Sequence, residues 1–288
     1  MLTEFLNVGW SGATVGATYA LAGLGILIAL RVTRVVNLAQ GEFYVVGALL
    51  AATLATAGVP LILGILAGAL AGAGLGAGEE LIVLRRMRNA TPPIMLLSTV
   101  AVATLLAGAE LLVWGQDPRS TPVLIGGRVV LGGVRLPAQS LLLVGLSIGV
   151  AVACWMVLER TSSGRAMSAI AEDPDAARLT GIDVLRLRLR GLAAAGAIGG
   201  AAGAIAVPLF LVDFNSGLEL ALRGFIAAAI SGSTALGTLA AGLGIGILEA
   251  LAVRYISPVF DDVTTFGILV IAVLMAPKTR FLRAVQAA

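Results

Sequence analysis

Long apolar runs separated by short polar stretches set the pattern of this chain. A helix needs about 20 apolar residues to cross a bilayer, and the runs leave room for about eight such helices. We expect them at residues 12–30, 45–57, 60–84, 91–114, 140–158, 191–212, 236–253 and 263–277. The pattern therefore predicts an all-α polytopic membrane protein, built as a single transmembrane domain over residues 1–288.

Polar side chains interrupt the start of the second apolar run. Asn37, Gln40 and Glu42 lie there within an otherwise apolar stretch. Lipid tolerates a carboxylate or an open backbone at membrane depth only where it faces protein or a water-filled cavity. These three residues are therefore candidates for lining a transport pathway. The alternative is a cap at the membrane edge, with Glu42 in headgroup water.

A second interruption follows the sixth run. Residues 220–233 are about 14 residues long, which is ~21 Å of helix against ~30 Å of hydrocarbon. We expect a re-entrant or broken half-helix here, and a turn whose hydroxyl groups satisfy free backbone groups. Ser231, Ser233 and Thr234 of that turn complete the candidate pathway residues. Because the two broken elements follow runs of opposite direction, they predict an inverted-topology repeat with half-helices meeting near mid-membrane.

Three further carboxylates lie near the ends of apolar runs. We expect Glu79 and Glu80 to pair at the membrane interface with the arginines that follow at 85–88. Glu110 lies one turn before Trp114, so an interfacial and a functional role are equally open for it.

The segment 116–138 is the largest one expected outside the membrane. Its β-branched runs are separated by Gly-Gly pairs, a pattern typical of a β-hairpin. We therefore predict a small external hairpin.

A polar segment at 159–190 separates the fifth and sixth runs and holds 11 of the 35 charged residues. Within it, Asp173 is an N-cap, Pro174 a first helical residue and Gly181 a stop signal. A helix of this length is not stable alone in water, so we interpret it as a docking element for a cytoplasmic partner, with Ala176, Ala177 and Leu179 as apolar contacts. The alternative is an ordinary loop with one helical turn. The candidate coupling residues are Glu172, Asp173, Pro174, Ala176, Arg178, Leu179 and Gly181.

Basic residues give the expected orientation. Of 19 Lys and Arg, 14 fall in segments placed on one side by this arrangement, and that side is the cytoplasm by the positive-inside rule. The N-terminus is therefore expected outside and the C-terminus inside.

Composition narrows the class further. A hydrophobic content of 59% with 12% charge and a mean hydropathy of +1.02 excludes a soluble domain. The 37 glycines favour close helix packing. With one cysteine and no histidine, an internal disulfide is excluded, and metal or Cys/His catalysis is not expected. The basic charge reflects membrane-edge arginines and indicates no nucleic-acid partner. Lys278 is the single lysine and follows no P-loop, so this chain is neither an ATPase nor, we expect, any other enzyme.

Three ordered motifs carry a resemblance over essentially the whole chain. They are residues 16–25 with 36–44, residues 160–182, and residues 222–238. Together they resemble the permeases of branched-chain amino acid ABC transporters of the LivH type. In that family the middle segment engages the ATPase subunits.

The resemblance implies a transmembrane permease subunit of an importer in the inner (plasma) membrane of a bacterium, for branched-chain or related amino acids. It implies a second permease, two cytoplasmic ATPase subunits that bind ATP and Mg, and an external substrate-binding protein; this chain itself needs no cofactor. Leu38, Gln40 and Ser231-Gly-Ser-Thr234 depart from the family pattern, so urea or short amides are an alternative substrate. An autonomous secondary transporter or channel is the alternative of another class, although the acidic residues cluster at run ends and in 159–190. A membrane-embedded enzyme ranks third, since no nucleophile and base are paired.

Overall fold

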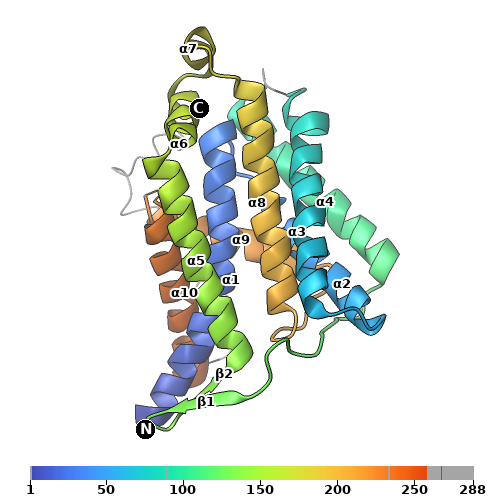
Figure 1. The fold of residues 1–288 in the computed structure, drawn as a ribbon, viewed down its shortest axis with the longest axis vertical. Coiled ribbons are helices and arrows are strands. Elements are labelled where there is room, and N and C mark those ends of the chain that lie inside the picture. The colour runs from blue at the N-terminus through green and yellow to red at the C-terminus, as the bar shows by residue number, and fades with distance from the viewer. Residues whose placement is uncertain (1, 88–89, 233, 258–266, 268–288) are drawn as a thin grey trace.

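The computed structural model describes residues 2–87, 90–232, 234–257 and 267, and these form an elongated helical bundle (Figure 1). The helices are α1 (Leu2–Thr33), α2 (Gln40–Thr56), α3 (Leu61–Glu79), the π-helix η1 (Glu80–Leu84), α4 (Pro92–Trp114), α5 (Ala138–Arg160), α6 (Ser162–Glu172), α7 (Pro174–Leu179), α8 (Val184–Ala206), α9 (Ser216–Ile230) and α10 (Ala235–Tyr255). The strands β1 (Arg128–Leu131) and β2 (Val134–Pro137) lie at one end of the bundle and α7 at the other.

Six helices in the described part of the chain are long and apolar enough to cross a membrane: α1, α3 with η1, α4, α5, α8 and α10. The all-α membrane fold is therefore confirmed. The helices α2 and α9, with 17 and 15 residues, are the two short elements that the polar interruptions predict. The expected run at 263–277 lies outside the described residues.

Two helix boundaries differ from the expected ones. Helix α2 begins at Gln40 rather than at residue 45, so Gln40 and Glu42 are helical, whereas Asn37 lies in the segment before the helix. Helix α8 begins at Val184, because Asp183 caps it through its side chain to the N–H of Arg186. The last part of the polar segment 159–190 is therefore the first two turns of α8.

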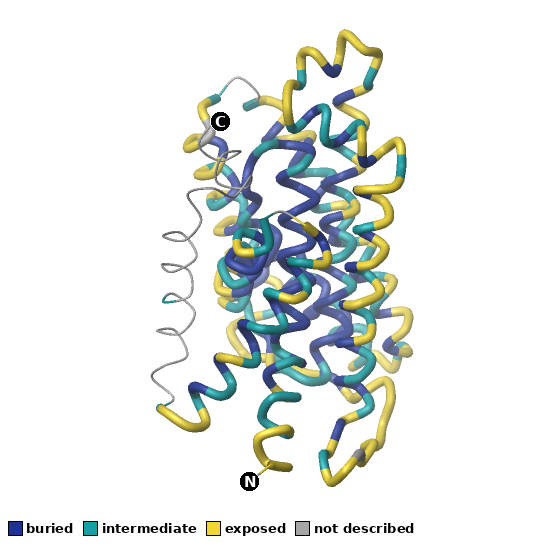
Figure 2. The backbone as a smooth tube through the Cα atoms, turned by 90° about the vertical axis from the view of Figure 1, so that its left-hand side faces the viewer, coloured by how far each residue is buried: buried dark blue, intermediate teal, exposed yellow. Residues whose placement is uncertain are grey.

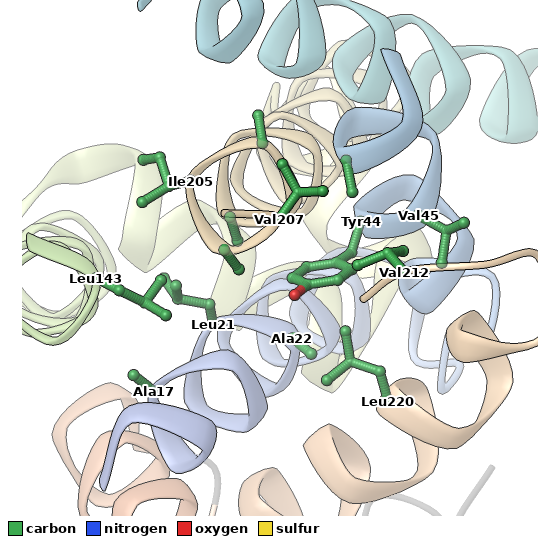
Figure 3. Close-up of a cluster of buried hydrophobic side chains, with 14 of the residues drawn as sticks. Ala17, Leu21, Ala22, Tyr44, Val45, Leu143, Ile205, Val207, Val212 and Leu220 are labelled. Atoms are coloured by element: carbon green, nitrogen blue, oxygen red, sulfur yellow. The ribbon is translucent and has the colours of Figure 1, made fainter. Parts of the chain in front are cut away.

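Helix α1 is the centre of the molecule. In its apolar window 89% of the residues are buried inside the protein, against 17% for α4 and 28% for α5. The dark interior of Figure 2 follows this arrangement. Figure 3 shows Ala17, Leu21 and Ala22 of α1 among core side chains from α2, α5 and the α8–α9 region, including Tyr44 and Leu143.

Glycines let α1 cross α10 closely. A Cβ atom at Gly12 would lie 2.5 Å from the carbonyl oxygen of Gly246, and one at Gly16 would lie 2.5 Å from that of Gly242. No larger residue fits at these positions without moving the backbones apart. The residue numbers run in opposite order, so α1 and α10 are antiparallel.

The pair α3 and α8 repeats this crossing. Gly72 of α3 meets the backbone of Gly196, and Gly68 meets that of Gly200. The two partners α3 and α10 also share a sequence pattern, Ala-Gly-x-Gly-x-Gly-x-x-Glu, at residues 71–79 and 241–249.

The short helices α2 and α9 also pack in equivalent ways on α8 and α1. Gly23 of α1 packs on the backbone of Gly224 in α9, and Gly203 of α8 packs on that of Tyr44 in α2. Helices α1 and α8 run in opposite directions, since Gly191 at the start of α8 meets Val32 at the end of α1. The unit α1–α2–α3 therefore matches α8–α9–α10 with opposite orientation, in agreement with the predicted inverted repeat.

The predicted β-hairpin is present. Strand β1 pairs with β2 in antiparallel register, with Leu131 opposite Val134. Gly132 and Gly133 form the turn with positive φ values of 57° and 86°, a conformation that glycine adopts without strain. The Asn7 side chain accepts a hydrogen bond from the N–H of Arg135, which ties the hairpin to α1.

Candidate translocation site and coupling loop

The start of α2 is held inside the protein by Asn37. Its side chain is buried, and its Oδ1 accepts a hydrogen bond from the N–H of Ala39 at 2.9 Å. Its Nδ2 donates to Oε2 of Glu79 at 2.5 Å, which joins α2 to the end of α3. Asn37 thus satisfies a free backbone group at the helix start, as a broken membrane element requires.

Gln40 clamps α2 to α8. Its Nε2 donates to the carbonyl oxygen of Ala195 at 2.8 Å, and the whole residue is buried. Gly25 of α1 and Gly199 of α8 leave the room for this side chain, since a Cβ atom at either position would collide with it. The geometry indicates a fixed structural contact in this conformation.

Glu42 faces a second buried carboxylate, Glu110 of α4. Both residues are almost fully buried, and Gly217 of α9 lies against the Glu42 carboxyl group. Within the described residues, both carboxylate oxygens of Glu110 and Oε2 of Glu42 have no hydrogen-bond partner. Oε1 of Gln40 and Oε1 of Glu79 are unpartnered there as well, so the unused hydrogen-bonding capacity is spread over the buried polar groups around α2. Glu110 faces Glu42 inside the protein and not solvent.

The partners of the carboxylates Glu79 and Glu80 differ from those that we expected. Glu79 binds Asn37, and Glu80 forms an ion pair with Arg188 of α8 at 2.8 Å. Both glutamates are buried within the protein. The π-helix η1 starts at Glu80, and its extra residue per turn changes the direction of the following side chains. Arg86, which we expected as a partner, instead donates to backbone carbonyls within η1.

The hydroxyl-rich turn between α9 and α10 lies apart from Asn37, Gln40 and Glu42. Ser231 Oγ donates to the carbonyl oxygen of Ala228, and Thr234 Oγ1 donates to that of Ser231. These bonds satisfy helix-end carbonyls as predicted. Thr234 lines a cavity with Arg31 and Arg165, whereas Asn37, Gln40 and Glu42 contact α3, α8 and α4. Ser233 lies outside the described residues.

The helix α7 has the ends that its sequence predicts. Asp173 Oδ1 accepts from the N–H groups of Asp175 and Ala176 at 2.9 and 3.0 Å. The N–H groups of Ala176 and Asp175 hold the pKa of the Asp173 carboxyl below its ordinary value. The cap is therefore intact above the usual Asp range and is lost only as pH falls through the lowered pKa. Pro174 is the first helical residue, and Gly181 has a φ of 85°.

Helix α7 packs on its own chain through one side. Ala177 is buried against Ile170 of α6 and Val184 of α8. Ala177 is therefore not available to a partner, contrary to expectation. Leu179 is 90% exposed, and Ala176, Glu172 and the Arg178–Asp175 ion pair are also exposed.

A cavity of about 430 Å³ joins this loop to the helical bundle. Arg178, Gly181 and Asp183 line one side of it, and Glu80 and Arg188 line the other. Glu80 is the first residue of η1 and is adjacent to Glu79, the partner of Asn37. The described residues contain no group of three or more His, Cys, Asp or Glu side chains placed to hold a metal ion.

Sequence comparison gives one family over most of the chain. The family described as branched-chain amino acid transport system, permease component, matches residues 10–275. The high-affinity branched-chain amino acid transport system permease protein BraD of Pseudomonas aeruginosa is 26% identical over 93% of this chain and 92% of its own length. A probable branched-chain amino acid transport permease protein LivH of Methanocaldococcus jannaschii is 29% identical over 89% and 86%.

Two further similarities are partial or concern the fold. The guanosine ABC transporter permease protein NupQ of Bacillus subtilis is 30% identical over 46% of this chain and 41% of its own. A chain of PsaBC from Streptococcus pneumoniae, solved in complex with Fab, has a TM-score of 0.51 at 13% identity and covers 98% of this chain and 99% of its own. At that identity the likeness concerns the fold.

Proposed function

Since the chain belongs to the family of branched-chain amino acid transport system permease components, we propose that it lines the substrate pathway of an ATP-driven importer and carries branched-chain amino acids inward. The chain is a multi-pass membrane transport subunit and not itself an enzyme. ATP and Mg²⁺ are bound by partner subunits in this proposal. The other partners are a second permease and an external binding protein, in the inner membrane, with the N-terminus outside and the C-terminus in the cytoplasm.

One continuous set of contacts carries the proposal. The cytoplasmic loop with α7 borders the Glu80–Arg188 ion pair. The neighbouring Glu79 binds Asn37, and Asn37 holds the first turn of α2. Movement of the loop therefore has a direct route to the buried helix start that carries Glu42. A permease that an external motor drives needs such a route from its cytoplasmic face to its interior.

In this proposal the coupling contact is the exposed part of the loop. Leu179 presents an apolar side chain, and the Arg178–Asp175 pair adds charge beside it. Helices that dock in a partner's groove combine an apolar anchor with a polar rim. Glu172, Asp173, Pro174, Ala176 and Gly181 set the shape of this surface. Asn37, Gln40, Glu42, Ser231, Ser233 and Thr234 remain the proposed pathway residues.

The test is reconstitution. The chain is purified together with candidate ATPase and permease partners, and the complex is placed in proteoliposomes with the binding protein. We expect leucine uptake that needs both ATP and the binding protein. Uptake of urea or a short amide in place of leucine would change the substrate, whereas uptake driven by an ion gradient without ATPase subunits would show a secondary transporter.

A further inference from the structure

A cavity distinct from the site at Asn37, Gln40 and Glu42 lies between α1, α2 and α9, and its volume is about 180 Å³. It belongs to the half of the bundle that carries the hairpin, because Val212 in its wall pairs with Arg119 of the external segment. Its lining combines apolar and aromatic side chains with one carboxylate and one guanidinium: Val15, Tyr44, Phe210, Leu220, Glu219 and Arg223.

The apolar wall is fixed by the core. Figure 3 shows Tyr44, Val212 and Leu220 side by side, and all three belong to the main buried cluster. Val15 and Phe210 pack against the same cluster. A rigid apolar wall beside a few placed polar groups is the usual composition of a small-molecule site.

Among the described residues, Arg223 in the charged wall lies near two carboxylates: Glu219, which lines the cavity, and Glu249, which does not. Arg223 pairs with Glu219 one turn away and approaches Oε1 of Glu249 at 3.6 Å, while its guanidinium lies 5.4 Å from the centre of the Tyr19 ring. Glu249 is buried and also accepts a hydrogen bond from the Tyr19 hydroxyl. The Glu219 side chain is 59% exposed. An ion pair with one exposed partner is weak and exchanges readily.

We propose that this cavity is an outer binding site for a zwitterionic α-amino acid with an aliphatic side chain. The ligand carboxylate replaces Glu219 on Arg223, a planar donor suited to carboxylates. The released Glu219 pairs with the ligand ammonium group. The aliphatic side chain packs on Val15, Phe210 and Leu220. Because a zwitterion adds no net charge, the charge balance of Arg223 with Glu219 and Glu249 is preserved.

The substrate class of this site rests on the proposed function, but the way in which the site recognises its ligand is a separate proposal. It requires both charged groups of the ligand and an apolar side chain of small size. The cavity volume is about 180 Å³, and its apolar wall can accommodate one short aliphatic side chain. A purely structural Arg223–Glu219 pair would show no such ligand selectivity.

The first measurement is protection from a thiol reagent in the purified permease complex without the binding protein. Leu211 lines the cavity and is 71% exposed, so Leu211→Cys in a Cys154→Ala background gives an accessible reporter, followed by mass spectrometry of this chain. We expect leucine to slow labelling. 4-Methylpentanoate, which lacks the ammonium group, 3-methylbutylamine, which lacks the carboxylate, and guanosine should not. Val130→Cys in the hairpin is the control and should be labelled equally with and without leucine.

The second measurement uses Glu219→Gln and Arg223→Lys in the same background. Both should abolish leucine protection and lower ATP-dependent leucine uptake by about tenfold, as expected for loss of a charge-assisted contact. Hydrolysis of ATP stimulated by the binding protein should continue. Glu4→Gln is the matched control, since the Glu4–Arg254 pair lies at the same end of α1 and α10 outside the cavity lining.

Two outcomes would overturn the site: no protection by leucine in a complex that transports it, or protection that survives in both variants. Equal protection by either analogue would also contradict recognition of a zwitterion. By contrast, a wild-type complex with no ATP-dependent leucine uptake would contradict the proposed function, whatever the labelling shows.

Discussion

Single buried polar residues near α2 have different roles. Asn37 and Gln40 each bind a group on another helix, so their side chains hold helices together in this conformation. Glu42 and Glu110 keep unpaired carboxylate oxygens among the described residues. A buried carboxylate without a partner is costly, and such a cost persists in transporters where the group acts during the cycle. Gln40 also keeps an unpaired oxygen, but Glu42 differs from Asn37 and Gln40 because it faces a second buried carboxyl group, and it is therefore the strongest functional candidate of the three.

Changing Glu42→Gln should lower transport while the complex still assembles. The amide keeps the size of the side chain but can neither release nor take up a proton beside Glu110. We expect ATP-dependent uptake to fall several-fold, measured in proteoliposomes, with a normal elution profile in detergent. Asp117→Asn, which changes an exposed carboxylate of segment 116–138, is the control. Wild-type uptake in Glu42→Gln would assign Glu42 a structural role.

At the scale of elements, the repeated crossings explain the glycine content. In each crossing the glycines are four residues apart, one helix turn, and the backbone of the partner fills the space of the missing side chains. Other glycines of the same helices face open space: a Cβ atom added at Gly74 or Gly78 in α3, or at Gly244 in α10, would have no neighbouring atom within 4 Å. The same residue type therefore has two different roles in one helix.

That difference predicts opposite results for two alanine substitutions in α3. Gly72→Ala places a methyl group against the backbone of Gly196 and should lower the melting temperature in detergent and the yield of folded protein. Gly74→Ala meets nothing and gains helix propensity of about 1 kcal/mol, so it should be neutral or stabilising. Equal behaviour of the two variants would show that α3 and α8 do not cross at Gly72.

The helix α7 gives the second prediction at this scale. Leu179→Glu puts a charge at an exposed apolar position, so the chain itself should insert and fold normally. Against a partner's groove the buried charge costs several kcal/mol, and assembly with the ATPase or substrate-stimulated hydrolysis should be lost. The control is Val130→Glu, an exposed apolar residue of the hairpin at the opposite end of the bundle. Normal assembly, hydrolysis and transport in Leu179→Glu would mean that α7 is only a loop element.

For the whole molecule, the hairpin and α7 lie at opposite ends of the bundle (Figure 1). The positive-inside rule places the α7 end in the cytoplasm. In a chain with Cys154 replaced, cysteines at Arg86 and Arg178 should react only from the inside, and one at Gly127 only from the outside. The assay is labelling of intact cells with an impermeant reagent. Reaction at position 178 from outside would reverse the orientation.

Local features of this fold could be predicted from sequence, because their causes lie within a few residues. The cap at Asp173 and the Gly132-Gly133 turn are of this kind. Partners across helices could not be predicted: Asn37 and Glu79 are 42 residues apart, and Arg188 and Glu80 are 108 apart. Such pairs depend on how the helices pack against one another in three dimensions. The matching patterns at 71–79 and 241–249 are visible in the sequence. Their meaning comes from the structure, where the two patterns lie in helices α3 and α10, and each helix packs through its glycines on the backbone of a partner helix.

The central position of α1 also has a consequence for how the protein is made. Tyr19 and Glu249 form a hydrogen bond across 230 residues of sequence. At 5–20 residues per second, a ribosome completes α10 roughly 10–50 s after α1. During that time lipid or the insertion machinery must occupy the glycine groove at Gly12 and Gly16. Helix α1, which is made before α10, is thus enclosed only after α10 has been inserted. A nascent chain that stops before α10 keeps this groove exposed, so the chain can pair with a wrong helix or be degraded.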